Sequence, residues 1–141
     1  SGEIRRYVRK ISGPLLDRID LHITVERPKY EELTSAVKQE SSAVIRERVL
    51  SACKRQEKRL EPYRIYRNGN MGHQEIRETC RITPDGKRLL EEVFRKLKLS
   101  PRGYDRLIKV ARTVADLDGA EDIGERHIAE TVSYRNTLQR M

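Results

Sequence analysis

The clearest pattern of hydrophobic and polar residues lies between Leu99 and Gly119, and it predicts a long helix at the centre of the fold. Ser100 is a favourable N-cap residue, and Pro101 follows at the first helical position, where its missing N–H costs nothing. Gly119 is placed to end the helix in a left-handed conformation. Apolar residues recur at helical spacing at Tyr104, Leu107, Ile108, Val110, Ala111, Val114, Ala115 and Leu117. This arc is too broad for a surface helix, so we expect an element of the core.

The polar residues of the same helix include two arginines near its N-terminus. Arg102 and Arg106 lie where the helix dipole repels positive charge, so each needs another partner, such as a carboxylate or a bound phosphate. Two i,i+4 pairs, Asp105–Lys109 and Arg112–Asp116, are expected to form along the helix.

Helical patterns on both sides of this segment predict a bundle of four or five helices from residue 30 onward. They cover residues 30–37, a long helix from Ser41 or Ser42 to Pro62, residues 73–80, a helix opened by Thr83 and Pro84, and a last helix after Gly124. The apolar stripe of the long helix consists of Ile45, Val49, Ala52, Cys53, Gln56 and Leu60. Residues 63–72, which include Asn68-Gly69-Asn70, are expected to form an exposed loop. The fold class is therefore mainly α.

One segment does not fit a helical fold. Residues 21–25 alternate between apolar and polar side chains as a strand does, and Pro28 ends the pattern. No second convincing strand is found, and a lone strand leaves its backbone groups unpaired. We therefore expect residues 1–29 to be the remnant of another domain whose remaining strands precede this sequence, and residues 30–141 to form the helical domain.

The composition points to anionic partners. Lysine and arginine number 30 against 22 acidic residues, which gives a formal net charge of +8. A basic helix face carries Arg46, Lys54, Arg55 and Lys58. A solvated face is the simpler interpretation of this set, and nucleic-acid contact is the alternative. No apolar run has membrane-spanning length and the two cysteines suit a reduced compartment, so the expected location is the cytoplasm without a membrane partner.

Motifs of a self-sufficient active site or metal site are missing from the sequence. The Gly86-Lys87 dipeptide does not complete a phosphate loop, because Arg81 replaces its first glycine and Arg88 its magnesium-binding hydroxyl residue. The informative residues are Arg18, in SGPLLDRIDLHI, and Arg102, in LSPRGYDRLIKVARTVADLDG. An arginine binds phosphate well because its planar fork donates two hydrogen bonds and stays charged. Spacing alone favours ordinary ion pairs for both.

Those two motifs, in that order, resemble the C-terminal part of the magnesium-chelatase-like AAA+ ATPases, in the branch that contains ComM and YifB. The resemblance runs from about Tyr7 to Arg135 and includes ESSAVIRERVLSACKRQ and the GNM segment of the following loop. It implies that residues 1–29 end an ATPase core and that the helical domain is its lid. It further implies that Arg18 is an arginine finger that reaches the ATP of a neighbouring subunit. Arg102 matches the sensor-2 arginine that contacts the γ-phosphate in its own subunit, and Arg106 could share that contact.

The resemblance also implies cofactors and partners. ATP and Mg²⁺ would bind in the full-length protein, whose phosphate loop lies upstream, and none is expected to bind this chain alone. The expected partners are the ATPase core, neighbouring subunits of a hexameric ring, and DNA, on which helicase or branch-migration work would be done. Two alternatives stay open: a motor subunit of a true magnesium chelatase, and a helical DNA-binding module without an ATPase role.

Overall fold

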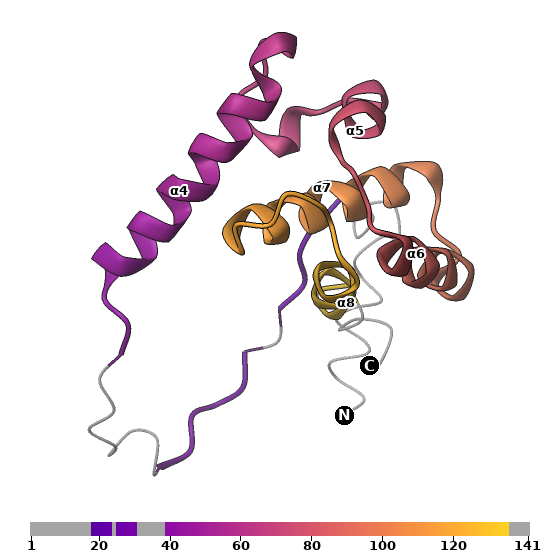
Figure 1. Ribbon diagram of the computed structural model, residues 1–141. Helices are drawn as coiled ribbons and strands as arrows, with labels where there is room; N and C mark the ends of the chain where they lie inside the picture. Colours follow the sequence, from indigo (N-terminus) through magenta and orange to yellow (C-terminus); the bar gives the residue numbers. More distant parts are fainter. Residues whose placement is uncertain (1–17, 24, 31–38, 136–141) are drawn as a thin grey trace.

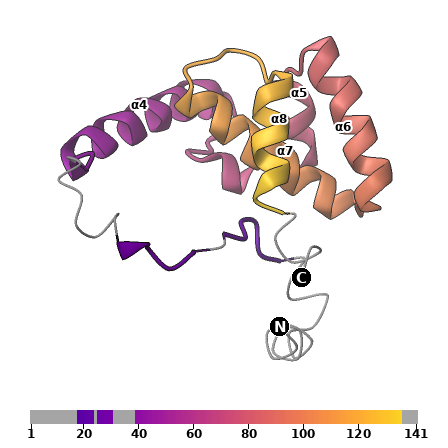
Figure 2. The ribbon, with the colours of Figure 1, turned by 90° about the horizontal axis from the view of Figure 1, so that it is seen from below.

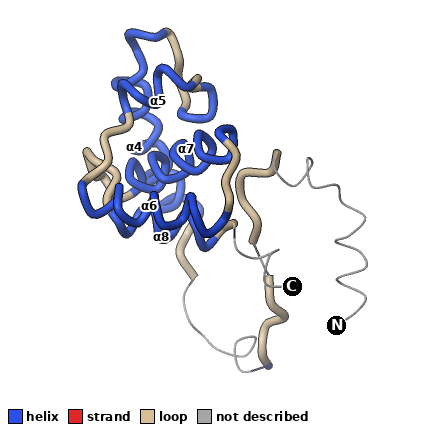
Figure 3. The backbone as a smooth tube through the Cα atoms, turned by 90° about the vertical axis from the view of Figure 1, so that its right-hand side faces the viewer, coloured by secondary structure: helices blue, strands red, loops and turns tan. Residues whose placement is uncertain are grey.

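The computed structural model describes residues 18–23, 25–30 and 39–135, and this part of the chain is mainly helical (Figure 1). The α-helices are α4 (Ser42–Leu60), α5 (His73–Thr79), α6 (Pro84–Leu97), α7 (Pro101–Leu117) and α8 (Glu125–Ser133), with short 3₁₀ turns η1 (Glu61–Tyr63) and η2 (Asn68–Asn70) after α4. Helices and loops account for all of the described residues in Figure 3, which contains no strand. The expected fold class is confirmed.

Helix α7 is the central element, as its pattern predicted. It packs against α4, α5, α8 and η2, and α6 packs against α8 (Figures 1 and 2). The Ser100 side chain accepts a hydrogen bond from the Gly103 N–H at 3.0 Å and so caps the helix. Gly119 adopts a φ of 75°, a left-handed value that a glycine reaches without strain. The buried residues of α7 are Gly103, Leu107, Ile108, Ala111, Arg112, Ala115 and Asp116.

The apolar core forms where the other elements meet α7. It contains Leu60, Met71, Ile76, Cys80, Leu90, Val93, Ile123 and Ile128 together with the apolar residues of α7. An isolated parallel bridge joins Ile82 to Ile123, and it ties the start of α6 to the loop before α8.

Helix α4 is only half packed. Its N-cap is Ser41, one of the two serines that were predicted to open it, and Ala52, Gln56 and Leu60 in its C-terminal half are buried. The predicted stripe does not continue toward the N-terminus, because Ile45 and Val49 remain 42% and 45% exposed. Figure 2 shows this end of α4 projecting away from the other helices, so no described element is in place to cover it.

The loop after α4 differs from the prediction. We expected residues 63–72 to be exposed, but Asn68 and Met71 are each only 2% exposed. Met71 joins the apolar core. Asn68 is buried because its side chain and its backbone N–H both bond to polar groups of α4 and α7. The prediction of an exposed loop was therefore wrong at these two positions, since turn residues indicate a change of direction and not exposure, whereas most of the loop is exposed.

The segment with strand-like alternation does not form a strand at residues 21–23 and 25, and Thr24 lies outside the described residues. No partner strand exists in the described part of the chain, so its backbone bonds elsewhere: the His22 N–H donates to the Tyr134 carbonyl at 2.8 Å. Of the helix predicted over residues 30–37, only Tyr30 belongs to the described residues, and it is helical.

Candidate functional site

The three arginines of α7 have different surroundings. Arg112 is fully buried and donates to the carbonyl oxygens of Glu121 and Ala120 at 2.6 and 2.7 Å. It also forms the predicted i,i+4 pair with Asp116, at 3.2 Å. Its donors thus close the turn after α7 from inside the fold. Arg112 is a structural residue, and it has no route to an external phosphate.

Asp116 is the centre of a buried polar network. Its two carboxylate oxygens accept hydrogen bonds from Arg59 of α4 at 2.7 Å each. The Asn68 side-chain amide donates to Asp116 at 2.9 Å and to the Thr113 hydroxyl at 3.0 Å. The network therefore fixes α4 and η2 on α7. The other predicted pair, Asp105–Lys109, is not formed: Asp105 lies 3.0 Å from His73, and Lys109 donates to the Gly69 carbonyl.

Arg106 lies one turn after Arg102 and forms an ion pair with Asp20 at 3.4 Å. Of the two partners that the dipole argument allowed, a carboxylate or a phosphate, Arg106 has a carboxylate, which comes from the segment preceding the helical domain. His22 lies in the same segment, and its backbone N–H donates a hydrogen bond to the backbone carbonyl of Tyr134, just beyond the end of α8. Burial, and then the charge of Arg135, lower the pKa of His22 below its ordinary value of 6.5. Figure 2 shows residues 18–23 beside the C-terminal end of α8.

Arg102 and Arg18 are both exposed. Neither forms an ion pair with any residue that the structure describes. Arg102 is in the first turn of α7, where backbone N–H groups and a guanidinium together favour an anion. The structure thus leaves available the two arginines that the sequence singled out, and it gives Arg106 a carboxylate partner.

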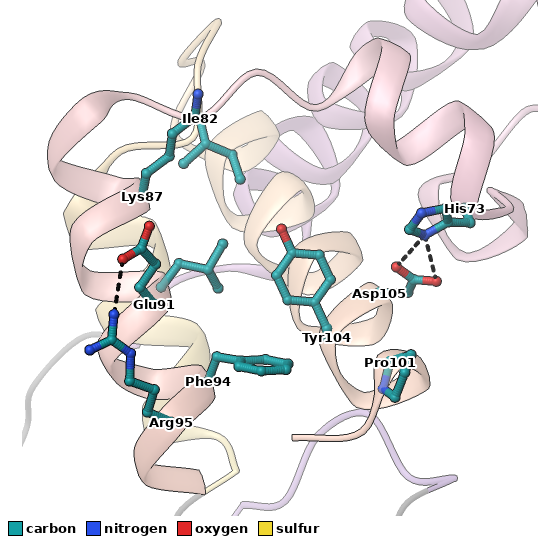
Figure 4. Close-up of a pocket in the computed structure, with 10 residues that line it drawn as sticks. His73, Ile82, Lys87, Glu91, Phe94, Arg95, Pro101, Tyr104 and Asp105 are labelled. Carbon is teal, nitrogen blue, oxygen red and sulfur yellow. Dashed lines mark hydrogen bonds and ion pairs between the residues drawn. The ribbon is translucent and has the colours of Figure 1, made fainter. Parts of the chain in front are cut away.

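A groove lies beside the first turn of α7, between α5, α6 and α7, with a volume of about 550 Å³ (Figure 4). Leu90, Phe94 and Tyr104 form its apolar wall, and the Phe94 and Tyr104 rings meet edge to face at 6.0 Å. Its ionisable lining residues are Lys87, Glu91, Arg95 and Asp105, together with His73. Pro101 lines the groove but Arg102 does not, so the groove and the arginine are neighbouring but separate features.

The basic residues of α4 are exposed as predicted: Arg46, Lys54, Arg55 and Lys58. Arg46 and Lys54 flank Leu50 in a shallow groove along the helix. The Arg55 guanidinium is close to Gly119, since a Cβ on that glycine would lie 3.3 Å from it. Arg59 also lies on this basic helix, but its side chain turns inward to Asp116 and does not contribute to the exposed basic surface.

Sequence reasoning missed the residues that work through partners far along the chain. Asp20 is separated from Arg106 by most of the chain, and Arg59 from Asp116 by 57 positions. Only the dipole argument indicated that Arg106 needed a negatively charged partner, a carboxylate or a phosphate. Among the described residues, no helix is long and apolar enough to cross a membrane, and no three His, Cys, Asp or Glu residues gather as a metal site.

Comparisons with known proteins place this chain in a family. Residues 39–135 match the family described as magnesium chelatase, subunit ChlI C-terminal, and residues 1–33 match magnesium chelatase, subunit ChlI. YifB of Salmonella typhimurium is 40% identical over 131 residues, which cover 92% of this chain and 25% of that protein. Competence protein ComM of Haemophilus influenzae is 38% identical over 134 residues, which cover 94% of this chain and 26% of that protein. The chain thus spans about a quarter of the length of these curated relatives. It belongs to the magnesium chelatase ChlI family.

Proposed function

We propose that this chain is the C-terminal region of a ring-forming AAA+ ATPase, in which the helical bundle is the lid over bound ATP. The observation that carries the proposal is that the three arginines of α7 differ in burial and in ion-pair partners. Arg112 is committed to the buried network and Arg106 is paired with Asp20, whereas Arg102 is exposed and unpaired among the described residues. An exposed guanidinium at a helix N-terminus, against the dipole, suits a phosphate that comes from outside the bundle.

In this proposal Arg102 contacts the γ-phosphate of ATP held by the core of its own subunit. Arg18 contacts the ATP of a neighbouring subunit, and Arg106 is a second candidate for the phosphate at Arg102. Each ATP with its Mg²⁺ supplies the phosphoryl group, and it receives positive charge from Arg102 of one subunit and from Arg18 of the neighbouring subunit. A cation that meets developing phosphoryl charge can accelerate transfer by several orders of magnitude. The phosphate loop and the ligands of Mg²⁺ come from the ATPase core.

DNA is the proposed substrate of the motor, with helicase or branch-migration work as the activity. The exposed basic residues of α4 and the net charge of +8 support an anionic polymer. The relative from Haemophilus influenzae is named a competence protein, which favours DNA. The family description, magnesium chelatase, favours a second candidate, a motor that drives metal insertion into a porphyrin.

The test is ATP hydrolysis by the full-length protein, with and without single-stranded or branched DNA. Arg18→Ala and Arg102→Ala are compared with wild type and with Arg88→Ala, an exposed arginine on α6 that pairs with Asp85. We expect DNA to stimulate hydrolysis, both test variants to lose it, and Arg88→Ala to retain it. Equal mixing of the two inactive variants should restore activity at about one quarter of the interfaces, because each interface joins two different patches.

Three results would contradict parts of the proposal. Normal hydrolysis by both variants would make the arginines structural and would refute their assignment. A motor of the chelatase type would be favoured if DNA left ATP hydrolysis unchanged while a partner protein that binds a porphyrin altered it. Salt-dependent DNA binding by this chain, unchanged by Arg102→Ala in a protein without ATPase activity, would favour the third interpretation, a DNA-binding module.

A further inference from the structure

We propose that the Asp20–Arg106 ion pair couples the two arginine positions of one subunit, so that Asp20 is a positioning residue for both Arg18 and Arg102. This inference rests on the proposed function. Asp20 follows Arg18 by two residues, and Arg106 follows Arg102 by one helical turn, on the same face of α7. The 3.4 Å contact between them therefore links the segment that bears one phosphate-seeking arginine to the helix that bears the other.

Two further bonds hold the same parts together. The His22 N–H donates to the Tyr134 carbonyl at 2.8 Å, which fastens the segment to the end of α8. The Arg135 guanidinium donates to the Gly103 carbonyl at 2.8 Å, which fastens the end of α8 to the first turn of α7. Residues 18–23, the end of α8 and the first turn of α7 thus form a closed set of contacts, which we call the docking cluster. Arg102 directly precedes Gly103 in the sequence and so belongs to the turn of α7 that the cluster holds.

In a ring, the two arginines of one subunit reach two different nucleotides. Arg102 would respond to ATP in its own subunit, and Arg18 would act on ATP in the neighbour. If the docking cluster moves as one body, lid movement over one nucleotide shifts the finger at the next. The Asp20 and Arg106 side chains are 58% and 31% exposed, so this ion pair alone is modest in strength, and the cluster depends on it together with the two hydrogen bonds.

The experiment compares four variants of the full-length protein. Asp20→Asn and Arg106→Gln each remove the ion pair, and the double exchange Asp20→Arg with Arg106→Asp restores it in reverse. The matched control is Glu40→Gln, which breaks another pair between an extended segment and a helix, Glu40–Arg48 at 2.8 Å. Two quantities are measured: the hydrogen-exchange protection factor of the His22 amide, and the Hill coefficient for ATP in hydrolysis.

We expect each single variant to lower the His22 protection factor by about two- to fivefold, the range of a partly exposed ion pair. The Hill coefficient should fall toward one, because ATP binding at one site of the ring no longer changes ATP binding at the next. The charge exchange should restore both quantities toward wild type. Glu40→Gln should change neither, since its ion pair lies outside the docking cluster.

Several outcomes would overturn the coupling. One is lower His22 protection with an unchanged Hill coefficient, since the pair would then be structural only. A second is loss of hydrolysis in Arg106→Gln as complete as in Arg102→Ala, without rescue by the charge exchange, because Arg106 would then contact phosphate itself. A wild-type Hill coefficient of one, or unchanged protection in both single variants, would also refute it. None of these touches the proposed function, which fails separately if Arg18→Ala and Arg102→Ala hydrolyse ATP normally.

Discussion

Removing the carboxylate of Asp116 should be the most destabilising single change among the polar residues of this fold. Asp116 is 2% exposed and accepts hydrogen bonds from Arg59 at 2.7 Å through both oxygens and from Asn68 at 2.9 Å. It is also 3.2 Å from Arg112, whose side chain is 1% exposed. Substitution by alanine leaves the guanidinium groups of Arg59 and Arg112 without their counter-charge, and that of Arg112 has no access to water.

The magnitude follows from burial. Breaking a buried ion pair by removal of one partner costs about 3–5 kcal/mol, because the remaining charge stays buried and uncompensated. Domains of this size have a free energy of unfolding of roughly 5–15 kcal/mol, so Asp116→Ala should consume a large part of it. Asp116→Asn keeps the shape and one acceptor oxygen, and it should fall between alanine and wild type. Arg59→Ala should cost less than Asp116→Ala, because Asp116 would keep Arg112 and Asn68.

The assay is urea unfolding of the 141-residue chain, followed by circular dichroism of its helices. Glu57→Ala is the matched control, since it breaks the surface pair Glu57–Arg67, whose side chains are 46% and 47% exposed. That control should cost no more than about 1 kcal/mol beyond the effect of helix propensity. If Asp116→Ala lowered the free energy of unfolding by no more than Glu57→Ala does, the argument from the buried network would be wrong.

The remaining predictions test the basic surface, the docked segment and the last helix. Changing the four exposed basic residues of α4 to alanine should reduce the slope of log affinity for DNA against log salt by as much as about 3–4, whereas four similar changes on α6 should reduce it far less. The α4 set is Arg46, Lys54, Arg55 and Lys58, and the α6 set is Lys87, Arg88, Arg95 and Lys96. The pKa of His22 is lowered when its segment is docked, so docking is strongest above 6.5 and weakens as the pH falls through the pKa of the docked form. The protection factor of the His22 amide should therefore drop between pH 7 and pH 5, and a rise would refute this. His127→Ala should cost about 1–3 kcal/mol in urea unfolding, because the ring accepts the Gly124 N–H at 2.9 Å and lies 3.0 Å from Asp118; a cost below about 0.5 kcal/mol would contradict this role.

The sequence was sufficient for the helices because their start and stop signals are local. Ser41 or Ser42, Thr83 and Ser100 were predicted to open helices, and Ser41, Thr83 and Ser100 each cap one through the side-chain oxygen. Gly119 ends α7 with a positive φ, as expected of its position. These signals involve residues three or four positions apart, so they act in the same way whatever surrounds the helix.

The exposure of several segments could not be predicted in the same way. Asn68 has the composition of a surface turn, yet it is buried because Arg59, Thr113 and Asp116 converge on its side chain. Val49 continues an apolar stripe that leads into the core, yet it stays exposed because no described element covers that end of α4. In both cases the outcome depends on what is brought near from far along the chain, and local periodicity carries no information on that.

The arginines of α7 show the same limit at the functional site. Arg102, Arg106 and Arg112 lie on one helix, and although sequence spacing assigned Arg112 to Asp116, it did not rank Arg102 against Arg106. Burial and long-range partners separate them: Arg112 holds Asp116 and two carbonyl groups, Arg106 holds Asp20, and Arg102 pairs with no described residue. A guanidinium whose hydrogen-bond donors are already used inside the fold would have to give up those bonds to bind phosphate, at a cost of about 1–3 kcal/mol for each donor left buried and unpaired. Arg102 can bind without that loss. Its assignment as the phosphate-contacting residue therefore depends on which of its neighbours are already occupied as much as on its own position in the helix.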